Sequence, residues 1–130
     1  EKFVARRKEI VAQYNQAFKE IEGVVIPYQD KYADSSWHLY VIQLELDKLK
    51  VGRKEIFEAL KELNIGVNVH YIPVYYFPYY QKLGYQKGLC PNAEHLYERM
   101  ITLPLFPQMT DVDVERVINS VSRVLGTYRK

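Results

Sequence analysis

One histidine and a dense group of tyrosines form the most promising chemistry of this sequence. The segment from His70 to Tyr80 contains five of the chain's 12 tyrosines. A tyrosine ring offers a flat stacking surface together with a hydroxyl group, which suits a sugar or a nucleotide base. An imidazole beside such rings can donate or accept a hydrogen bond near neutral pH. These residue types indicate a small-molecule site, and core packing with tyrosine rims is the competing explanation for part of the cluster.

Trp37 and His38 form a second candidate pair at the start of another expected strand. Strand ends and the loops that follow them are where a rigid scaffold commonly presents binding residues. The pair could therefore face the same side of the molecule as His70. A structural role for His38 is an equal alternative.

Other kinds of chemistry find little support. The three histidines, His38, His70 and His95, are far apart, and no Cys or His pair has the spacing of zinc ligands, so we predict no metal site. No glycine-rich phosphate loop is present. Cys90 with His70 would make a nucleophile and base, but a small residue before a helix is common, which makes this the weakest hypothesis. His95, inside an expected helix, is predicted to be a surface residue.

Composition narrows the class of protein. The chain has 130 residues, 48% of them hydrophobic, which fits one domain with one core. Its net charge of +2, from 18 basic and 16 acidic residues, is too balanced for a nucleic-acid partner. The basic run Arg6–Lys8 is flanked by Glu1 and Glu9, which predicts a solvated helix face.

Targeting signals are also missing from the sequence. A single cysteine permits no intrachain disulfide, and nothing suggests secretion. We see no signal peptide and no apolar run near the roughly 20 residues that span a bilayer, so we expect a cytoplasmic protein without a membrane partner. A start at Glu1, already within a helical pattern, suggests a fragment of a longer protein.

Hydrophobic periodicity places these candidates on a small α/β scaffold. Helical spacing and strand alternation predict helices over 3–21, 53–63, 78–83, 91–99 and from 110 onward, and extended segments over 24–27, 37–46, 66–71 and 101–103. Gly23, Asn64 and Gly84 mark helix ends, and Thr110 with Asp113 marks the start of the last helix. The expected fold is α/β (α+β), with a small, mostly antiparallel sheet covered by helices.

Four segments, in order, resemble the DegT/DnrJ/EryC1/StrS sugar aminotransferases. Ser35–Ile42 is similar to the family's His-x-Tyr strand, and Asn64–Pro73 is similar to its VHY-P strand. Pro78–Tyr85 is similar to its PYY and LGY stretch, and Thr102–Asp111 is similar to its LPL-P-MT end. The resemblance covers nearly the whole chain. Within the family it is nearest to the 4-aminotransferases of pseudaminic acid biosynthesis and to the spore-coat polysaccharide type.

The resemblance implies the C-terminal small domain of a type I aminotransferase fold, residues 1–130, without the large N-terminal domain. That large domain would carry pyridoxal phosphate on a lysine, and no lysine here matches its motif. The complete enzyme would be a homodimer that moves an amino group from glutamate to a keto sugar nucleotide, such as a UDP-4-keto-6-deoxy-HexNAc. This domain would supply no catalytic or cofactor-binding residue. Its implied substrate contacts are His70 and Tyr71, supported by Trp37, His38, Pro73 and Tyr75.

A stand-alone carbohydrate-binding or protein-interaction module, built on the tyrosine cluster, is the main alternative. Such a module would need no further domain and no cofactor. The two hypotheses differ in whether the native polypeptide extends beyond this segment.

Overall fold

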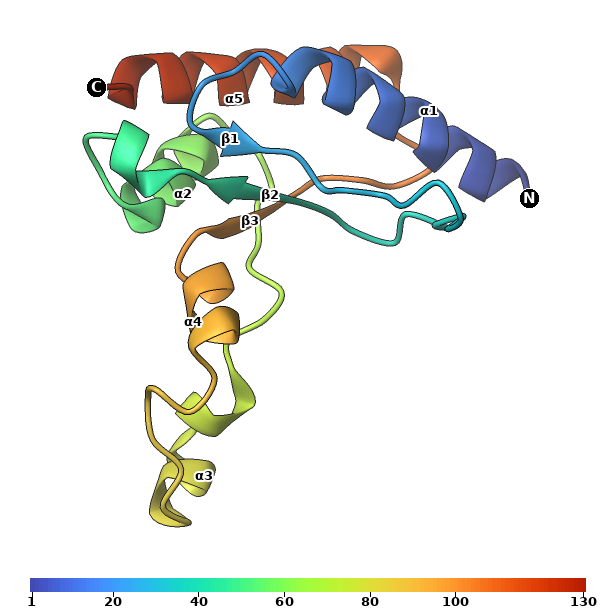
Figure 1. Ribbon diagram of the computed structural model, residues 1–130. Helices are drawn as coiled ribbons and strands as arrows, with labels where there is room; N and C mark the ends of the chain where they lie inside the picture. The colour runs from blue at the N-terminus through green and yellow to red at the C-terminus, as the bar shows by residue number, and fades with distance from the viewer.

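The computed structural model describes residues 1–130 and shows a layered body from which a narrow arm projects (Figure 1). Its helices and strands are α1 (Lys2–Phe18), β1 (Val24–Val25), β2 (Tyr40–Leu44), α2 (Arg53–Glu62), α3 (Pro78–Lys82), α4 (Pro91–Tyr97), β3 (Met100–Leu103) and α5 (Asp111–Tyr128). Short 3-10 turns lie at Leu46–Lys48 and Val74–Tyr76. We call residues 71–98 the arm and the remaining residues the body.

The sheet is antiparallel, with the strand order β1-β2-β3. Val24 lies opposite Leu44 and Tyr40 lies opposite Leu103. Along β2, Tyr40, Ile42 and Leu44 are buried, whereas the residues between them are only half-buried. Side chains alternate between the faces of a strand, so this pattern gives the sheet one apolar core face. The predicted small antiparallel sheet with helices is confirmed.

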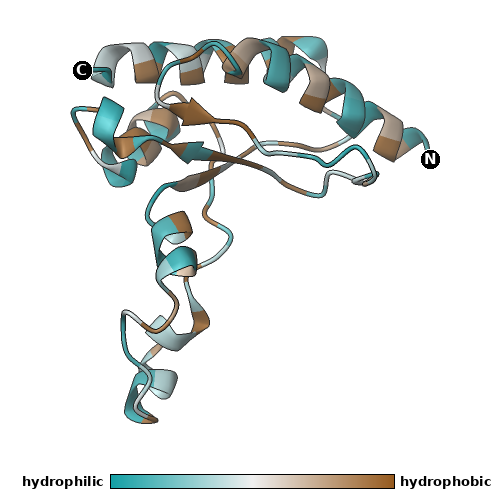
Figure 2. Cartoon of the chain, viewed as in Figure 1, coloured by the Kyte–Doolittle hydropathy of each residue, from teal (hydrophilic) through white to brown (hydrophobic).

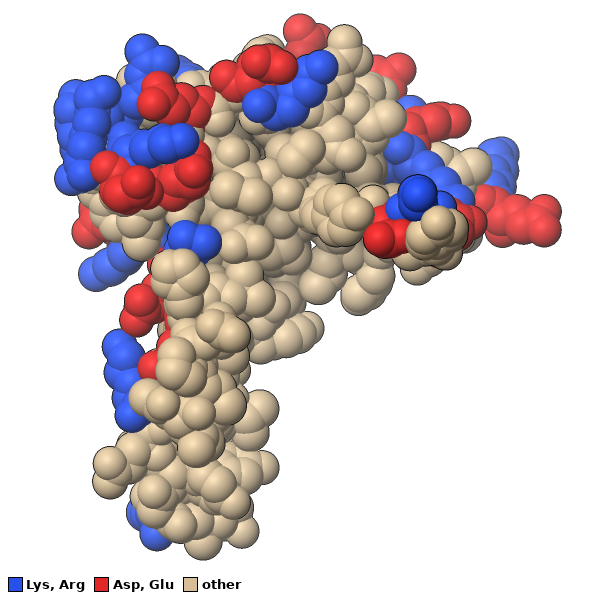
Figure 3. Space-filling model, in the orientation of Figure 1, with Lys and Arg blue, Asp and Glu red and all other residues tan.

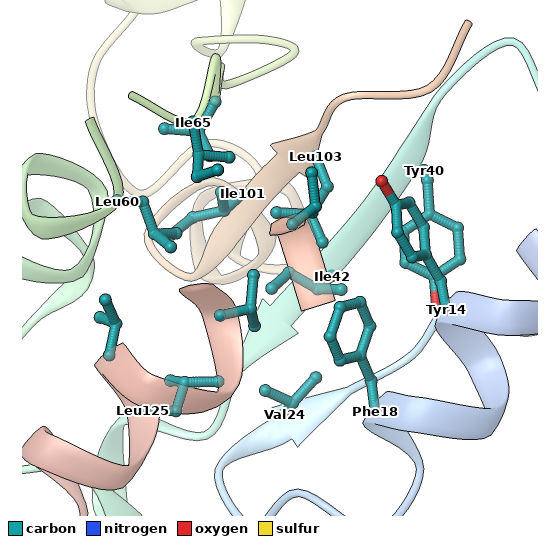
Figure 4. Close-up of a cluster of buried hydrophobic side chains, with 14 of the residues drawn as sticks. Tyr14, Phe18, Val24, Tyr40, Ile42, Leu60, Ile65, Ile101, Leu103 and Leu125 are labelled. Atoms are coloured by element: carbon teal, nitrogen blue, oxygen red, sulfur yellow. The ribbon is translucent and has the colours of Figure 1, made fainter. Parts of the chain in front are cut away.

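Helices α1 and α5 lie side by side across the core face of the sheet (Figure 1). Both helices are polar outside and apolar inside (Figure 2), as the 3.6-residue period requires. On α1, Tyr14 and Phe18 are fully buried and stack at 5.5 Å between ring centroids. These rings meet the strand residues in the close-up of the core (Figure 4). The buried hydrophobic cluster comprises 21 residues, all of them in the body.

Local signals set the ends of these helices. The Thr110 hydroxyl accepts a hydrogen bond from the Asp113 amide, and the Asp113 carboxylate accepts one from the Thr110 amide, so the predicted capping box is present. Asn64 after α2 has φ +59°, the left-handed conformation expected of it. The first helix, expected to run to residue 21 and stop at Gly23, ends earlier at Phe18, and Gly23 with φ +92° belongs to the turn into β1.

Two expected strands are shorter than the alternation predicts. The segment Gly66–Tyr71 is not a strand, because only Asn68 pairs with β3, through a single bridge to Thr102. In that antiparallel register Gly66 would lie opposite Pro104, and proline has no N–H to donate. The strand predicted over 37–46 is reduced to β2, since Trp37 has φ +50° and Leu46 begins a 3-10 turn.

The basic run near the N-terminus is half-buried rather than fully solvated, which corrects the prediction. Arg6 donates to Asp111 at 2.8 Å and to Glu9 at 3.1 Å, and Arg7 donates to the Ser36 carbonyl. Lys8 pairs with Asp34. The guanidinium of Arg6 thereby joins α1 to the start of α5.

The arm has a different character. Residues 71–98 contribute nothing to the hydrophobic cluster, and their two helices have five and seven residues. No helix of the chain is both long and apolar enough to span a membrane. No group of three or more His, Cys, Asp or Glu side chains is placed to hold a metal ion.

Candidate functional site

His70 lies where the chain leaves the body and enters the arm. It is half-buried, and its Nδ1 lies 2.9 Å from the Oγ1 of Thr102 on β3. Thr102 and Asn68 form the bridge next to it, and residues two apart on an extended chain point to the same side. His70 therefore lies against the sheet face opposite the one that α1 and α5 cover.

Tyr71 adds an exposed ring to the same corner. Its ring centroid is 4.7 Å from that of His70, with an interplanar angle of 76°. The side chain is 71% exposed, so the phenol is free to contact another molecule. The peptide bond between the two residues is cis. An imidazole and a phenol thus lie together at an open surface, as expected from the sequence.

In Figure 3 the concave side of the junction between the body and the arm, to the right of the arm, is lined by uncharged side chains, whereas charged side chains lie along its left side. Lys, Arg, Asp and Glu gather mainly on the outer parts of the body in that view. A tyrosine ring beside an imidazole offers a sugar ring both stacking surface and hydrogen-bonding groups.

Trp37 does not join this corner. Its ring lies 6.2 Å from that of Tyr40, and it lines a hollow of about 310 Å³ together with Val11 and Asn15 of α1. Trp37 therefore faces the helix-covered side of the sheet, opposite to His70. His38 is exposed, and no hydrogen bond joins it to His70. The contribution of this pair to a substrate site stays a prediction.

Pro73 and Tyr75 lie further along the arm. Pro73 is buried and precedes the 3-10 turn Val74–Tyr76. The Tyr75 hydroxyl donates to the Glu94 carboxylate at 2.7 Å and lies 3.4 Å from the Cys90 carbonyl. Because that hydroxyl is already paired, Tyr75 holds the arm together in this structure, and its contact with a substrate stays a prediction.

Glu94 is the residue that sequence reasoning missed. It is 7% exposed and also accepts a hydrogen bond from the Gly88 amide at 2.6 Å. Burial alone would raise the pKa of Glu94, but the hydrogen bonds from Tyr75 and Gly88 outweigh it and hold the pKa below the ordinary 4.5. No local signal in the sequence marks Glu94 as buried, because glutamate is typical of the solvated face of a helix. Its neighbour His95 is exposed, as predicted.

The functional groups at the corner can stack and form hydrogen bonds, and their contact with a substrate stays a prediction. His70, Tyr71 and Thr102 offer an imidazole, a phenol and a hydroxyl, none of which forms an imine with an aldehyde. No lysine makes a hydrogen bond or an ion pair with these residues; Lys48 pairs with Glu45 at 2.8 Å and Lys54 lies 3.9 Å from Glu58. Cys90 is exposed and makes no hydrogen bond to His70.

A sequence profile of the DegT/DnrJ/EryC1/StrS aminotransferase family matches residues 1–122. The spore coat polysaccharide biosynthesis protein SpsC of Bacillus subtilis is 45% identical over 122 residues, which are 92% of this chain and 31% of SpsC. The structure of Helicobacter pylori PseC, an aminotransferase involved in the biosynthesis of pseudoaminic acid, superposes with a TM-score of 0.86 and 27% identity over 97% of this chain and 33% of PseC.

A putative sugar aminotransferase of Streptococcus pneumoniae, Spr1654 in its PMP-form, gives a TM-score of 0.86 and 29% identity over 96% of this chain and 31% of that one. The chain spans about a third of the length of the curated relatives it matches. A self-contained binding module is not favoured by these similarities, because the relatives with names are aminotransferases or polysaccharide biosynthesis proteins.

Proposed function

The chain belongs to the DegT/DnrJ/EryC1/StrS aminotransferase family, and from this premise we propose that it is the C-terminal small domain of a sugar aminotransferase. The complete protein would transfer an amino group from glutamate to a keto sugar nucleotide. The observation that carries the proposal is the corner at His70, where an imidazole held by Thr102 lies against an exposed phenol at the point where the chain enters the arm. That corner occurs within the segment that matches the family.

The part played by this chain's residues follows from their positions. The Thr102 contact fixes the His70 ring, which leaves Nε2 as the nitrogen that a sugar oxygen can reach. The exposed Tyr71 ring provides stacking surface and a second hydrogen-bonding group. Together they would bind and orient the sugar and close one side of its pocket, where a correct position lowers the barrier of the chemical step.

Pyridoxal phosphate, bound in the full-length enzyme, would supply the electron sink for transamination. As part of the same proposal, the lysine that holds it would lie in the large N-terminal domain, outside this chain. A homodimer through that same part, and a cytoplasmic location consistent with a single free cysteine, belong to the same proposal.

The substrate is best sought among UDP-4-keto-6-deoxy-HexNAc sugars. The similarity to SpsC and to PseC supports a sugar of surface or spore polysaccharides. An assay of the full-length protein with glutamate and a panel of keto sugar nucleotides tests this choice. Amination of this class above the others supports it, and a preference for another class would replace it.

Substitution His70→Ala in the full-length enzyme tests the site. A lost hydrogen bond is worth about 0.5–1.5 kcal/mol, and more where a buried partner is left unpaired. We therefore expect kcat/KM for the keto sugar to fall by about tenfold to a hundredfold. The half-reaction with glutamate needs no sugar and should change little.

Thermal melting of the same variant provides the control. If His70 only packs against Thr102, the alanine variant will melt earlier and both half-reactions will fall together. That result would remove His70 from the substrate site while leaving the family membership intact.

A further inference from the structure

A buried hydroxyl stands out on β3, the last strand of the sheet. Only Glu94 and Thr102 are buried polar or charged residues in this chain, and Thr102 is 4% exposed. Its neighbours on β3, Met100, Ile101 and Leu103, are all apolar and buried. A hydroxyl left unpaired at such a position is costly, so its partner matters. That partner is the Nδ1 atom of His70, at 2.9 Å.

The backbone holds Thr102 more firmly than it holds His70. Thr102 exchanges two hydrogen bonds with Asn68, of 2.8 and 3.1 Å, and lies opposite Val41 on its other side. Its branched side chain also has few rotamers. His70, by contrast, lies beyond the last bridge, where the chain turns into the arm. The threonine is therefore the fixed point and the imidazole is the group that it orients.

We propose that Thr102 is a positioning residue that fixes the ring orientation and the tautomer of His70; this inference rests on the proposed function. The Thr102 hydroxyl has no hydrogen-bond acceptor other than Nδ1. In the neutral imidazole, one nitrogen carries the proton and the other accepts. Donation from the hydroxyl to Nδ1 thus keeps the ring proton on Nε2. Nε2 then becomes a hydrogen-bond donor directed at the open corner.

The tautomer decides what the site recognises. An Nε2–H group donates to a carbonyl or hydroxyl oxygen, both of which a keto sugar presents. The opposite tautomer would present a bare nitrogen, which repels a carbonyl oxygen. Thr102 would therefore favour substrates that place an oxygen acceptor at Nε2 of His70, although Thr102 itself does not touch the substrate. Metal-binding histidines are oriented in the same way by a hydrogen-bond partner that does not bind the metal.

Thr102→Val and Thr102→Ser in the full-length protein test the inference. Valine keeps the shape and removes the hydroxyl, whereas serine keeps the hydroxyl. We expect the valine variant to lose about tenfold in kcat/KM for the keto sugar, the size of one hydrogen bond, with the glutamate half-reaction unchanged. We expect the serine variant to stay within about threefold of the parent, since it retains the same bond.

Nitrogen NMR of histidine-labelled protein gives a readout that simple packing would not move. The His70 signal, assigned by its loss in His70→Gln, should show the proton on Nε2 in the parent and serine proteins. In the valine variant the two tautomers should mix. An unchanged tautomer in Thr102→Val would overturn the inference, as would equal loss in both half-reactions without rescue by serine.

The same measurements separate this inference from the proposed function. If the full-length protein aminates no keto sugar nucleotide, the proposed function fails, and the tautomer in the valine and serine variants still decides whether Thr102 controls His70. If His70→Ala reduces sugar use but Thr102→Val does not, Thr102 has no positioning role and the function stands.

Discussion

The body of this molecule has a hydrophobic core, whereas the arm has none. All 21 residues of the hydrophobic cluster lie in the body. The arm, residues 71–98, instead carries eight of the chain's 14 exposed large hydrophobic side chains. They are Tyr71, Val74, Phe77, Tyr79, Leu83, Tyr85, Leu89 and Leu96. Burial of apolar surface dominates the stability of the body, whereas the arm leaves such surface in water.

Specific contacts take the place of a core in the arm. Glu94 joins Tyr75 to the Gly88 turn, and the Tyr76 and Tyr97 rings meet edge to face at 6.0 Å. The Arg53 guanidinium of α2 lies 4.8 Å from the Tyr97 ring centroid and ties the arm to the body. Helices as short as α3 and α4 are marginal by themselves in water, so these contacts decide whether the arm holds its shape.

Phenylalanine truncations should separate the two regions most clearly. Phe18 is fully buried between Tyr14 and Tyr40, so Phe18→Ala should lower the free energy of unfolding of this chain by about 3–5 kcal/mol. Phe77 in the arm is 46% exposed, and Phe77→Ala should cost less than about 1 kcal/mol. Urea denaturation followed by circular dichroism measures both. Equal losses would mean that the arm belongs to the same cooperative core.

Substitution of helix N-cap residues should also reduce the free energy of unfolding more in the body than in the arm, by a smaller amount than the phenylalanine truncations. Thr110→Ala removes the cap of α5 in the body and should cost about 1 kcal/mol, while Thr110→Ser should keep most of it. Cys90 is the N-cap residue of α4 in the arm, but its side chain makes no capping hydrogen bond. Cys90→Ala should therefore change the free energy of unfolding by no more than about 0.5 kcal/mol. A larger loss for the cysteine than for the threonine would contradict this comparison.

Glu94→Gln should have the smallest effect on global unfolding and a local effect on the arm. The amide cannot reproduce both hydrogen bonds of the carboxylate with the same charge assistance, so amides of residues 71–98 should exchange faster with deuterium. Amides of β2 and β3 should keep their protection. Hydrogen exchange read by mass spectrometry checks this. Loss of protection throughout the chain would show that Glu94 supports the body as well.

Acid should act on the arm through the same carboxylate. The folded pKa of Glu94 lies below 4.5, so its contribution is complete at neutral pH and is lost as the pH falls through that lower value. After correction for the intrinsic exchange rate, the protection of arm amides should stay constant near neutral pH and fall in acidic buffer, where Glu94 becomes protonated. The glutamine variant, which does not titrate, provides the matched control. Identical acid responses in the two proteins would exclude Glu94 as the cause.

Much of this protein follows from its sequence. Helical periodicity predicted α1, α2 and α5, and the Thr110–Asp113 pair predicted the start of α5, because each signal depends on residues within a turn or two of one another. Alternation in Tyr40–Leu44 likewise marked the core face of β2. The motif order gave the family, which the profile match over residues 1–122 confirms. His70 and Tyr71 were marked as neighbours by sequence alone.

Tertiary structure decided how those pieces meet. The expected strand at Gly66–Tyr71 is reduced to one bridge, between Asn68 and Thr102, and on the Gly66 side Pro104 has no N–H to extend the ladder. Trp37 turned to the helix-covered side, and Glu94 was buried by Tyr75 and Gly88. The contact of His70 with Thr102 joins residues 32 positions apart. Periodicity and capping report only local energies, whereas pairing, burial and ring orientation depend on atoms that the fold alone brings together.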